Sequence, residues 1–381
     1  MEIKKITIHQ IHIPLKIAFA TAQFNRIMAN NIVVKVETSE HIFGYGESVP
    51  RTYVTGEDTN KVVSVIKADL APHLIGRKIE NIEEAETALS QLSDKAIWTQ
   101  GYCPSSALCA LDLAILDATG HFHKRSVTAL LGGDFSAYST YSICIPLVDG
   151  EALNNILTIV KRYSINHVKV KVGSTLKADI ERLRTVRRQL GESAEIWIDA
   201  NCQWGSQEAI ERINIFNEFK ISCVEQPVAA NNFSGLAEVK RNVTPAIIAD
   251  ESACSYADVQ KLIALDACDI FNIKISKCGG LYNSLRIYKL IRDAGKACAL
   301  GYHIGETGIL EAAGRTFALV TGDLKYLEGS VSSLILKENI VCENLEFDEY
   351  GRAPALPQAG LGVTINENVL HKYTVYREEI N

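Results

Sequence analysis

The sequence predicts an α/β protein built on a (β/α)8-type barrel, with a smaller α+β unit in front of it. From about residue 138, short apolar segments alternate with segments whose apolar residues recur at helical spacing, and together they give eight strands with intervening helices. No G-x-G-x-x-G motif follows any of these strands, which disfavours the alternative of a doubly wound open sheet.

The N-terminal unit has a different pattern. Alternating apolar and polar residues predict strands over 2–15 and 31–38, and apolar residues at helical spacing predict helices over 57–70 and 105–119. The pair Gly132-Gly133 then interrupts the chain. We therefore predict an α+β domain over 1–130, a barrel domain over 131–330, and a tail over 331–381 that packs back on the first domain.

The barrel elements follow in order along the chain. Strands are predicted over 141–146, 167–172, 195–200, 222–227, 246–251, 270–275, 297–303 and 324–329. The clearest helical patterns occupy 179–191, 207–219, 256–266 and 281–295, the last of which ends on a glycine suited to a helix C-terminus.

The bulk composition favours a globular cytoplasmic protein. The 381 residues carry a net charge of -6, so we expect no basic field that would hold nucleic acid or an anionic membrane. No apolar run approaches the ~20 residues of a membrane span, and the start MEIKKITIHQIHIPLK lacks the apolar core of a signal peptide. The ten cysteines occur without CxxC pairs, which indicates buried thiols in a reducing cytoplasm.

Charged residues lie at the ends of four consecutive predicted strands. Asp199, Glu225 and Asp250 each close a strand, and Lys274 lies late in the next one, at separations of 26, 25 and 24 residues. One strand–helix unit has about that length, so each charge reaches the C-terminal mouth of the barrel, where active sites are built. Three carboxylates without His or Cys form a hard oxygen site, so we predict that they bind Mg²⁺, with Mn²⁺ as an alternative.

The strand before Asp199 reads HVKVKVG (167–173) and carries two lysines on one face. Side chains alternate along a strand, so the three valines share one face while Lys169 and Lys171 share the other. The solvated face of an edge strand is the simpler explanation of this pattern. The series of carboxylates at the strand ends favours a functional explanation, in which both lysines point into the barrel mouth. There the metal and their mutual repulsion lower the lysine pKa, so that one abstracts a proton and its neighbour tunes it.

Further motifs extend this pattern over nearly the whole chain. They are D-x-N (199–201), V-E-Q-P (224–227), A-D-E-S (249–252), N-I-K-x-x-K-x-G-G (272–280), GYGESVP (44–50), LLGG (130–133) and AGLGV (359–363). Together with the K-x-K pair they resemble the enolase superfamily, and within it the muconate-lactonizing-enzyme subgroup (mandelate racemase/muconate lactonizing enzyme family). The resemblance implies a (β/α)7β modified TIM barrel under an N-terminal α+β capping domain.

The same resemblance implies a mechanism and roles for individual residues. Mg²⁺ would hold a substrate carboxylate as an enediolate, with Lys171 and Lys274 as bases on opposite faces of the substrate and Lys169 in support. Substrate contacts are expected from Asn201, Glu306, Glu328, Thr52, Tyr53 and His303. We expect Lys277 to be structural, and strand alternation predicts that Glu251 points away from the site. Family members are commonly homo-oligomers, which we expect here too.

The barrel motifs do not separate the reactions of the subgroup, because all pass through the same enediolate. The loop VPRTYVTGED (49–58) resembles that of dipeptide epimerases, but LEGS (327–330) lacks one acid of the D-x-D that these enzymes usually carry. Bases on both faces favour an isomerase that epimerises or racemises a dipeptide or an N-acyl amino acid. The alternatives are a muconate-type cycloisomerase, an o-succinylbenzoate synthase, or a barrel that binds a carboxylate ligand without turning it over.

Overall fold

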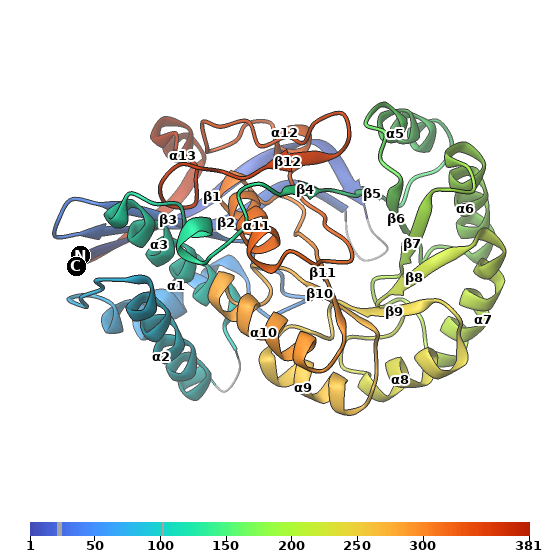
Figure 1. Cartoon of the computed structure of the whole chain (residues 1–381), viewed down its shortest axis with the longest axis horizontal. Helices are drawn as coiled ribbons and strands as arrows, with labels where there is room; N and C mark the ends of the chain where they lie inside the picture. The colour runs from blue at the N-terminus through green and yellow to red at the C-terminus, as the bar shows by residue number, and fades with distance from the viewer. Residues whose placement is uncertain (21–24, 101–102) are drawn as a thin grey trace.

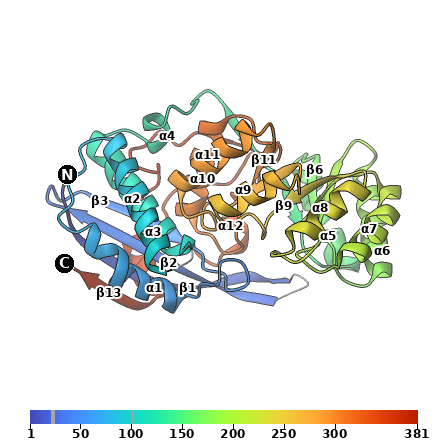
Figure 2. The same cartoon turned by 90° about the horizontal axis from the view of Figure 1, so that it is seen from below.

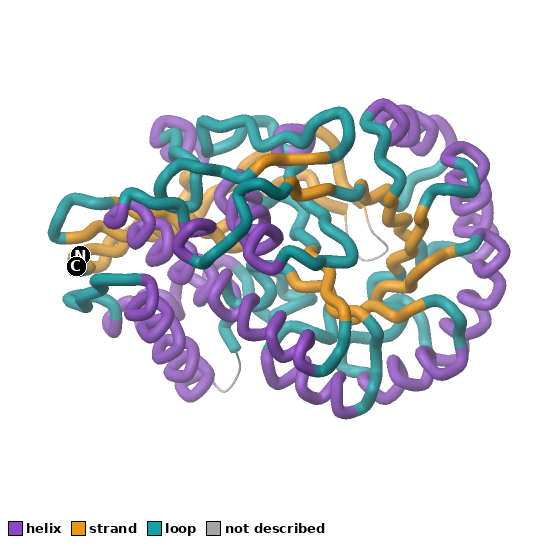
Figure 3. The backbone as a smooth tube through the Cα atoms, viewed as in Figure 1, coloured by secondary structure: helices purple, strands orange, loops and turns teal. Residues whose placement is uncertain are grey.

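The centre of the molecule is a curled parallel sheet of seven strands, in the order β11-β10-β9-β8-β7-β6-β5. The structure is a computed structural model, and it describes residues 1–20, 25–100 and 103–381. Helices alternate with the strands along the chain and lie outside the sheet (Figure 1), so that strands form an inner layer and helices an outer one (Figure 3). This arrangement confirms the predicted barrel class.

Each strand of this sheet is followed by a helix. The strands are β5 (Ile143–Ile145), β6 (His167–Lys171), β7 (Glu195–Asp199), β8 (Ile221–Glu225), β9 (Ala246–Ala249), β10 (Ile270–Ile273) and β11 (Ala297–Leu300). The helices are α5 (Gly150–Arg162), α6 (Leu176–Leu190), α7 (Ser206–Phe216), α8 (Phe233–Asn242), α9 (Tyr256–Ala264), α10 (Leu281–Asp293) and α11 (Gly308–Thr321). The strands are buried at almost every position, as expected for parallel strands covered on both faces.

The eighth predicted strand, over 324–329, is the one barrel strand that the sequence predicts wrongly. This segment forms no regular strand, yet it connects the two edges of the sheet. Glu328 N donates to Leu300 O (2.8 Å) on one side, and Ser142 N donates to Leu327 O (2.8 Å) on the other. Lys325 N also donates to Cys298 O (2.7 Å) and Leu300 N to Tyr326 O (2.9 Å). The alternation in the sequence therefore marks an extended segment correctly, and this segment pairs with β11 through a single parallel bridge between Leu300 and Leu327.

The N-terminal unit is an antiparallel sheet with helices packed against it. The sheet has the order β13-β1-β2-β3, formed by β1 (Ile3–Ala20), β2 (Asn25–Thr38), β3 (Phe43–Ser48) and β13 (Thr374–Ile380). Its helices are α1 (Thr59–Val65), α2 (Ile82–Gln100) and α3 (Ser105–His123). The sequence pattern predicts β1, β2, α1 and α3 but not β3, β13 or α2, and it extends the first helix over 66–70, which forms a π-helical turn.

Two glycines of the GYGESVP motif let β3 lie directly on α3. A Cβ atom on Gly44 would lie 2.2 Å from Ala114 O, and one on Gly46 would lie 2.1 Å from Ala110 O, so no larger residue fits at either position. This close contact fixes the end of β3, and with it the start of the loop over 49–58 that follows.

The tail of the chain lies against the N-terminal unit. Strand β13 pairs antiparallel with β1, and both termini lie at the same end of the molecule (Figures 1 and 2). Asp117 of α3 accepts hydrogen bonds from Leu361 N (2.7 Å) and from Tyr45 N (2.8 Å).

Among the described residues, no helix combines the length and the apolar character that crossing a membrane requires.

Candidate active site

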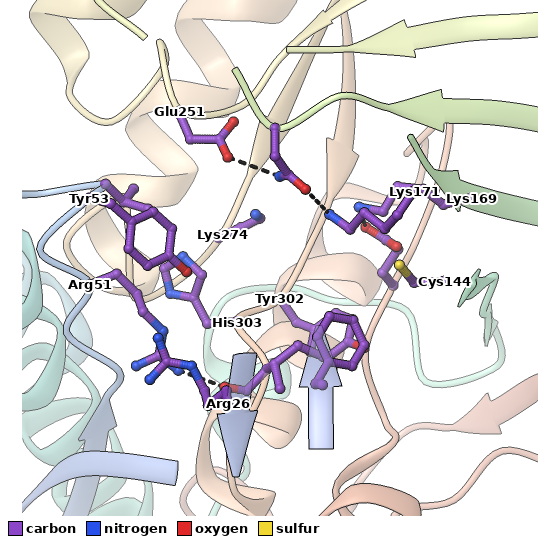
Figure 4. A pocket seen from close by; sticks show the side chains of 15 residues that line it. Arg26, Arg51, Tyr53, Cys144, Lys169, Lys171, Glu251, Lys274, Tyr302 and His303 are labelled. Carbon is purple, nitrogen blue, oxygen red and sulfur yellow. Dashed lines mark hydrogen bonds and ion pairs between the residues drawn. The ribbon is translucent and has the colours of Figure 1, made fainter. Parts of the chain in front are cut away.

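A small pocket of about 50 Å³ lies where the barrel mouth meets the N-terminal unit (Figure 4). Strand ends of the barrel provide one part of its wall, and β1, β2 and the loop over 49–58 provide the other. The pocket is lined by Phe19, Arg26, Arg51, Tyr53, Val54, Cys144, Lys169, Lys171, Asn201, Glu251, Lys274, Tyr302, His303, Ile304 and Glu328.

The two lysines of HVKVKVG lie on an interior strand. Strand β6 pairs with β5 on one side and with β7 on the other, so it is not an edge strand. Lys169 is 3% exposed and Lys171 is 7% exposed, and both line the pocket. The simpler explanation, a solvated outer face, is therefore excluded.

The three carboxylates at the strand ends lie at neighbouring positions of the barrel mouth. Asp199 pairs in register with Lys171 on one side and with Glu225 on the other, and Asp250 directly follows β9. All three carboxylates are buried. Their mutual repulsion contributes to the pKa values of Asp199 and Glu225, so the negative charges are close enough to influence one another.

Lysine ammonium groups are the nearest partners of Asp199 and Asp250. Lys171 Nζ lies 2.5 Å from Asp199 Oδ2, and Lys274 Nζ lies 2.5 Å from Asp250 Oδ2. Lys169 Nζ lies 2.5 Å from Glu328 Oε2 and 3.4 Å from Glu225. The two lysines expected to act as bases thus reach the pocket from different strands, each beside a different carboxylate.

The pKa values of these lysines shift in the direction opposite to our expectation. Burial alone would lower the pKa of Lys171 and of Lys274, but the Asp199 and Asp250 carboxylates outweigh burial and raise both pKa values. The expectation considered a metal ion and the repulsion between Lys169 and Lys171, and it omitted the direct ammonium–carboxylate contacts. Both lysines are therefore ammonium groups while these contacts persist.

The donor set fits a hard divalent cation. Burial, followed by the charge of Asp199, raises the pKa of Glu225 to about 8, which shows that negative charge is under-compensated there. One oxygen of the neighbouring Glu251, Oε2, is buried without a hydrogen-bond partner. In the described part of the chain the acids do not form a ready-made group of three metal ligands, since lysines take their oxygens. Oxygen donors and excess negative charge nevertheless match the preference of Mg²⁺.

Lys277 holds Asp250 in place through hydrogen bonds. It is fully buried, and its Nζ donates to Asp250 Oδ1 (2.9 Å), Asp250 O (2.6 Å) and Asn272 O (2.7 Å). Asn272 in turn donates to Glu225 Oε1 (2.9 Å). The K-x-G-G turn thus fixes one carboxylate of the mouth and is connected to a second.

The expectation that Glu251 points away from the site is wrong. Strand β9 ends at Ala249, so the alternation of side chains does not continue to Glu251, which lines the pocket (Figure 4). Asn201 Nδ2 donates to Glu251 Oε1 (3.1 Å), and Asn201 Oδ1 accepts from Lys171 Nζ (2.9 Å). Asn201 therefore links Glu251 to one of the two lysines.

The other expected substrate contacts are not all brought into the pocket. Tyr53, His303 and Glu328 line it, whereas Glu306 does not, although its Oε1 accepts a hydrogen bond from His303 N (2.7 Å). Thr52 has an exposed side chain and is not among the lining residues described, although both its neighbours are.

Sequence reasoning missed seven lining residues: Phe19, Arg26, Arg51, Val54, Cys144, Tyr302 and Ile304. Phe19 and Arg26 lie far from every motif, and no local pattern marks them. Arg51 lies inside the loop over 49–58 and could have been found as its only cation, while Tyr302 directly precedes His303.

Comparisons with known proteins agree with this geometry. Residues 3–132 match the family described as the mandelate racemase / muconate lactonizing enzyme N-terminal domain, and residues 151–369 match the enolase C-terminal domain-like family. The N-succinyl-L-Arg/Lys racemase of Bacillus cereus is 28% identical over 99% of both chains, and its crystal structure superposes with a TM-score of 0.91 at 27% identity, covering all of both chains.

Two epimerases are also similar to the chain. The L-Ala-D/L-Glu epimerase of Clostridium acetobutylicum is 34% identical over 79% of this chain and 82% of its own. A dipeptide epimerase of Cytophaga hutchinsonii, solved with Mg and the dipeptide D-Ala-L-Val, has a TM-score of 0.90 and 26% identity, with full coverage of both chains.

Proposed function

The chain belongs to the mandelate racemase/muconate lactonizing enzyme family of the enolase superfamily, and we propose that it is an isomerase of amino acid derivatives. In this proposal it inverts the configuration of the α-carbon next to a carboxylate, in a dipeptide or in an N-acyl amino acid. One observation carries the proposal: Lys171 on β6 and Lys274 after β10 bring two ammonium groups to one pocket from different strands. Two positioned amines are what inversion needs, because one removes the proton and the other returns it to the opposite face.

The charges of the site support the roles of the two lysines. Asp199, Glu225 and Asp250 would hold Mg²⁺, with Mn²⁺ as an alternative, and the bound cation would supply positive charge to the substrate carboxylate as the α-proton leaves. Lys171 and Lys274 hold and move the proton on their own sides, and Lys169 orients its neighbours through its contacts with Glu328 and Glu225. Asn201, Tyr53, His303 and Glu328 would contact the substrate, with Glu306 acting through His303.

The proposal is tested by solvent-deuterium exchange, followed by NMR on each pure stereoisomer of a panel of dipeptides and N-acyl amino acids. Lys274→Ala should abolish inversion and keep α-proton exchange of the stereoisomer that faces Lys171, which still removes the proton and returns a deuteron on the same side. Lys171→Ala should give the mirror pattern. Lys169→Ala should slow both directions, and loss of a general base typically costs ~10²–10⁴ in rate.

The same experiment separates this function from the alternatives. Dehydration would lose water, and cycloisomerisation would remove the absorbance of a diene, whereas inversion adds deuterium without losing atoms. If Lys274→Ala inverts the α-carbon at a rate near that of the wild type, the assignment of two bases is wrong.

We also propose that the enzyme acts in the cytoplasm and that it forms a homo-oligomer. Its domains would be the capping domain over 1–130, the barrel over 131–330, and the C-terminal segment over 331–381. All ten cysteines are free thiols, which agrees with a reducing compartment. The oligomeric state is tested by light scattering of the purified protein.

A further inference from the structure

A small cluster of buried residues lies inside the barrel, below its charged mouth. Five strands and the closing segment over 324–329 each contribute one member: Trp197, Cys223, Ile248, Ile270, Ala299 and Tyr326. Trp197 and Cys223 precede the carboxylates Asp199 and Glu225 by two positions on β7 and β8. Side chains two positions apart along a strand lie on the same face, so this cluster forms the floor under the carboxylates.

Trp197 is a member of the floor whose side chain reaches a carboxylate of the mouth. It is 1% exposed, and its Nε1 donates a hydrogen bond to Glu225 Oε2 (3.4 Å). An indole has one N–H donor and no acceptor, and burying that donor without a partner is unfavourable. Glu225 satisfies this donor, so the positions of the two side chains depend on one another.

Glu225 accepts hydrogen bonds from neutral donors on both of its oxygens. Asn272 Nδ2 donates to Oε1 (2.9 Å), and Trp197 donates to Oε2. The Lys169 ammonium lies 3.4 Å from each oxygen. A carboxylate oxygen can accept two hydrogen bonds, so the two neutral donors leave each oxygen able to bind a cation. If a metal ion replaced the Lys169 ammonium, both neutral hydrogen bonds could remain.

The indole of Trp197 is itself held in place from below. It stacks on the ring of Tyr326, with ring centroids 4.3 Å apart and planes inclined by 14°. The Tyr326 hydroxyl donates to Glu195 Oε1 (2.7 Å) and lies 3.2 Å from Cys223 Sγ. Rotating the indole would separate two stacked aromatic rings, so the direction of its N–H is fixed.

We propose that Trp197 is a positioning residue of the metal site, and that its indole N–H holds the Glu225 carboxylate in the orientation that binds Mg²⁺. The inference rests on the proposed function, which assigns Glu225 to the metal. Trp197 is not among the residues that line the pocket, so it acts through Glu225 and not on the substrate. Through Tyr326, the closing segment over 324–329 becomes part of the support of the metal site.

The first test removes the N–H donor and keeps an aromatic ring. Trp197→Phe should raise the Kd for Mg²⁺ about 10-fold, as measured by calorimetric titration. This is the lower end of the range for residues that orient metal ligands, because Lys169 and Asn272 still contact Glu225. The rate of α-proton exchange should recover when Mg²⁺ is raised to saturation. An unchanged Kd would show that Trp197 only fills the barrel interior, and would overturn the proposal.

Trp204 offers a matched control, because it is a second buried tryptophan on the segment that follows β7. It is 4% exposed, and its Nε1 has no hydrogen-bond partner among the described residues. Trp204→Phe makes the same chemical change without taking a donor from a carboxylate, so the Kd for Mg²⁺ should stay at the wild-type value. If Trp204→Phe raises the Kd as much as Trp197→Phe does, the lost volume and not the lost N–H is the cause, and the proposal is overturned.

A spectroscopic measurement covers the case in which Trp197→Phe does not fold. Protein labelled with ¹⁵N-tryptophan gives one indole N–H signal in the NMR spectrum for each of its three tryptophans. Trp98→Phe and Trp204→Phe assign two of these signals, which leaves the third to Trp197. That signal should shift as Mg²⁺ saturates the protein, because the cation withdraws negative charge from the acceptor of this N–H.

The two titrations together separate the failure of this inference from the failure of the proposed function. A Trp197 signal that stays in place while calorimetry records Mg²⁺ binding would overturn the positioning role and leave the metal site intact. Absence of Mg²⁺ binding in the wild-type protein would overturn the positioning role together with the metal site of the proposed function.

Discussion

Buried carboxylates occur in two regions of the molecule, and their partners differ. At the barrel mouth, Asp199 and Asp250 contact lysine ammonium groups. At the seam between the N-terminal unit and the barrel, carboxylates instead accept backbone N–H groups at the starts of barrel helices. Asp112 of α3 accepts from Leu281 N (2.8 Å) and Tyr282 N (3.1 Å) of α10, and Glu47 of β3 accepts from Thr307 N (3.0 Å) beside α11.

The difference shows in the pKa values of the two regions. Burial would raise the pKa of Asp250, but Lys274 and Lys277 outweigh it and hold the pKa well below its ordinary value. At the seam, burial raises the pKa of Asp112 and of Glu47 to about 7, because hydrogen bonds offset burial only in part. Asp112 accepts them from backbone amides, and Glu47 accepts them from the Thr307 hydroxyl as well as from backbone amides. At the mouth, the carboxylates contact ammonium groups, which a metal ion could replace. At the seam, hydrogen bonds hold each acid in one fixed arrangement.

The largest effect is expected when a carboxylate of the mouth is neutralised. Glu225→Gln should reduce activity by more than the ~10–100-fold that follows changes around metal ligands. The unfolding free energy of the protein in EDTA should not fall, because the pKa of about 8 means that the charge of Glu225 is unfavourable in the fold. Exchange rates measure the activity, calorimetric titration measures Mg²⁺ binding, and urea unfolding in EDTA measures the unfolding free energy. A variant that binds Mg²⁺ and reacts like the wild type would remove Glu225 from the metal site.

A seam carboxylate should show the opposite result. Asp112→Ala leaves the amides of Leu281 and Tyr282 buried without their acceptor, at a cost of ~1–3 kcal/mol for each unsatisfied group. We expect urea unfolding to show a loss of about 2–4 kcal/mol, with an unchanged exchange rate per folded molecule. Asp134→Ala, in an exposed loop, is the control that should change neither. An unchanged unfolding free energy for Asp112→Ala would contradict the structural role of the seam.

The seam should also give stability a characteristic pH dependence. Glu47 has a folded pKa of about 7 and an ordinary value of 4.5, so between these values the folded protein keeps a proton that the unfolded chain releases. The unfolding free energy therefore falls as pH rises from 4.5 to 7, by up to about 3 kcal/mol for this group. Glu47→Gln should remove this part of the slope. Urea unfolding at several pH values measures it, and an identical slope in the variant would contradict the assignment.

The smallest effect is expected at Thr52, in the loop beside the pocket. Because its side chain is exposed, Thr52→Ala should change kcat/KM by no more than about twofold, as is usual for surface substitutions. Tyr53→Ala, one residue further on and in the pocket wall, should change it more. Equal effects of the two variants would show that the loop rearranges around the substrate.

The sequence predicted the mouth better than the seam, for a physical reason. Asp199, Glu225 and Asp250 recur with the length of one strand–helix unit, so a regular fold converts their spacing into proximity. Glu47 and Asp112 have no such periodicity. Their partners lie 260 and 169 residues away along the chain, and only the packing of the two units brings them together.

The remaining errors have local causes. The pKa of Lys171 depends on a contact of 2.5 Å with Asp199, which no pattern of residue types can establish. Glu251 points into the pocket because β9 ends two residues before it, and strand ends are the least predictable part of an element. Arg26 and Phe19 reach the pocket from β1 and β2, whose residues carry no motif.

The irregular closing segment of the barrel, 324–329, has a consequence for how this site can change over time. Backbone hydrogen bonds with β11 and with Ser142 hold this segment in place, and they do not depend on its side chains. Glu328, which contacts Lys169, lies on this segment. A substitution there alters the charge of the pocket without disturbing a regular ladder. The fold thus places the two lysines expected to act as bases and the charge of Glu328 on separate parts of the wall, so a substitution at Glu328 can change the charge that a substrate meets without moving Lys171 or Lys274.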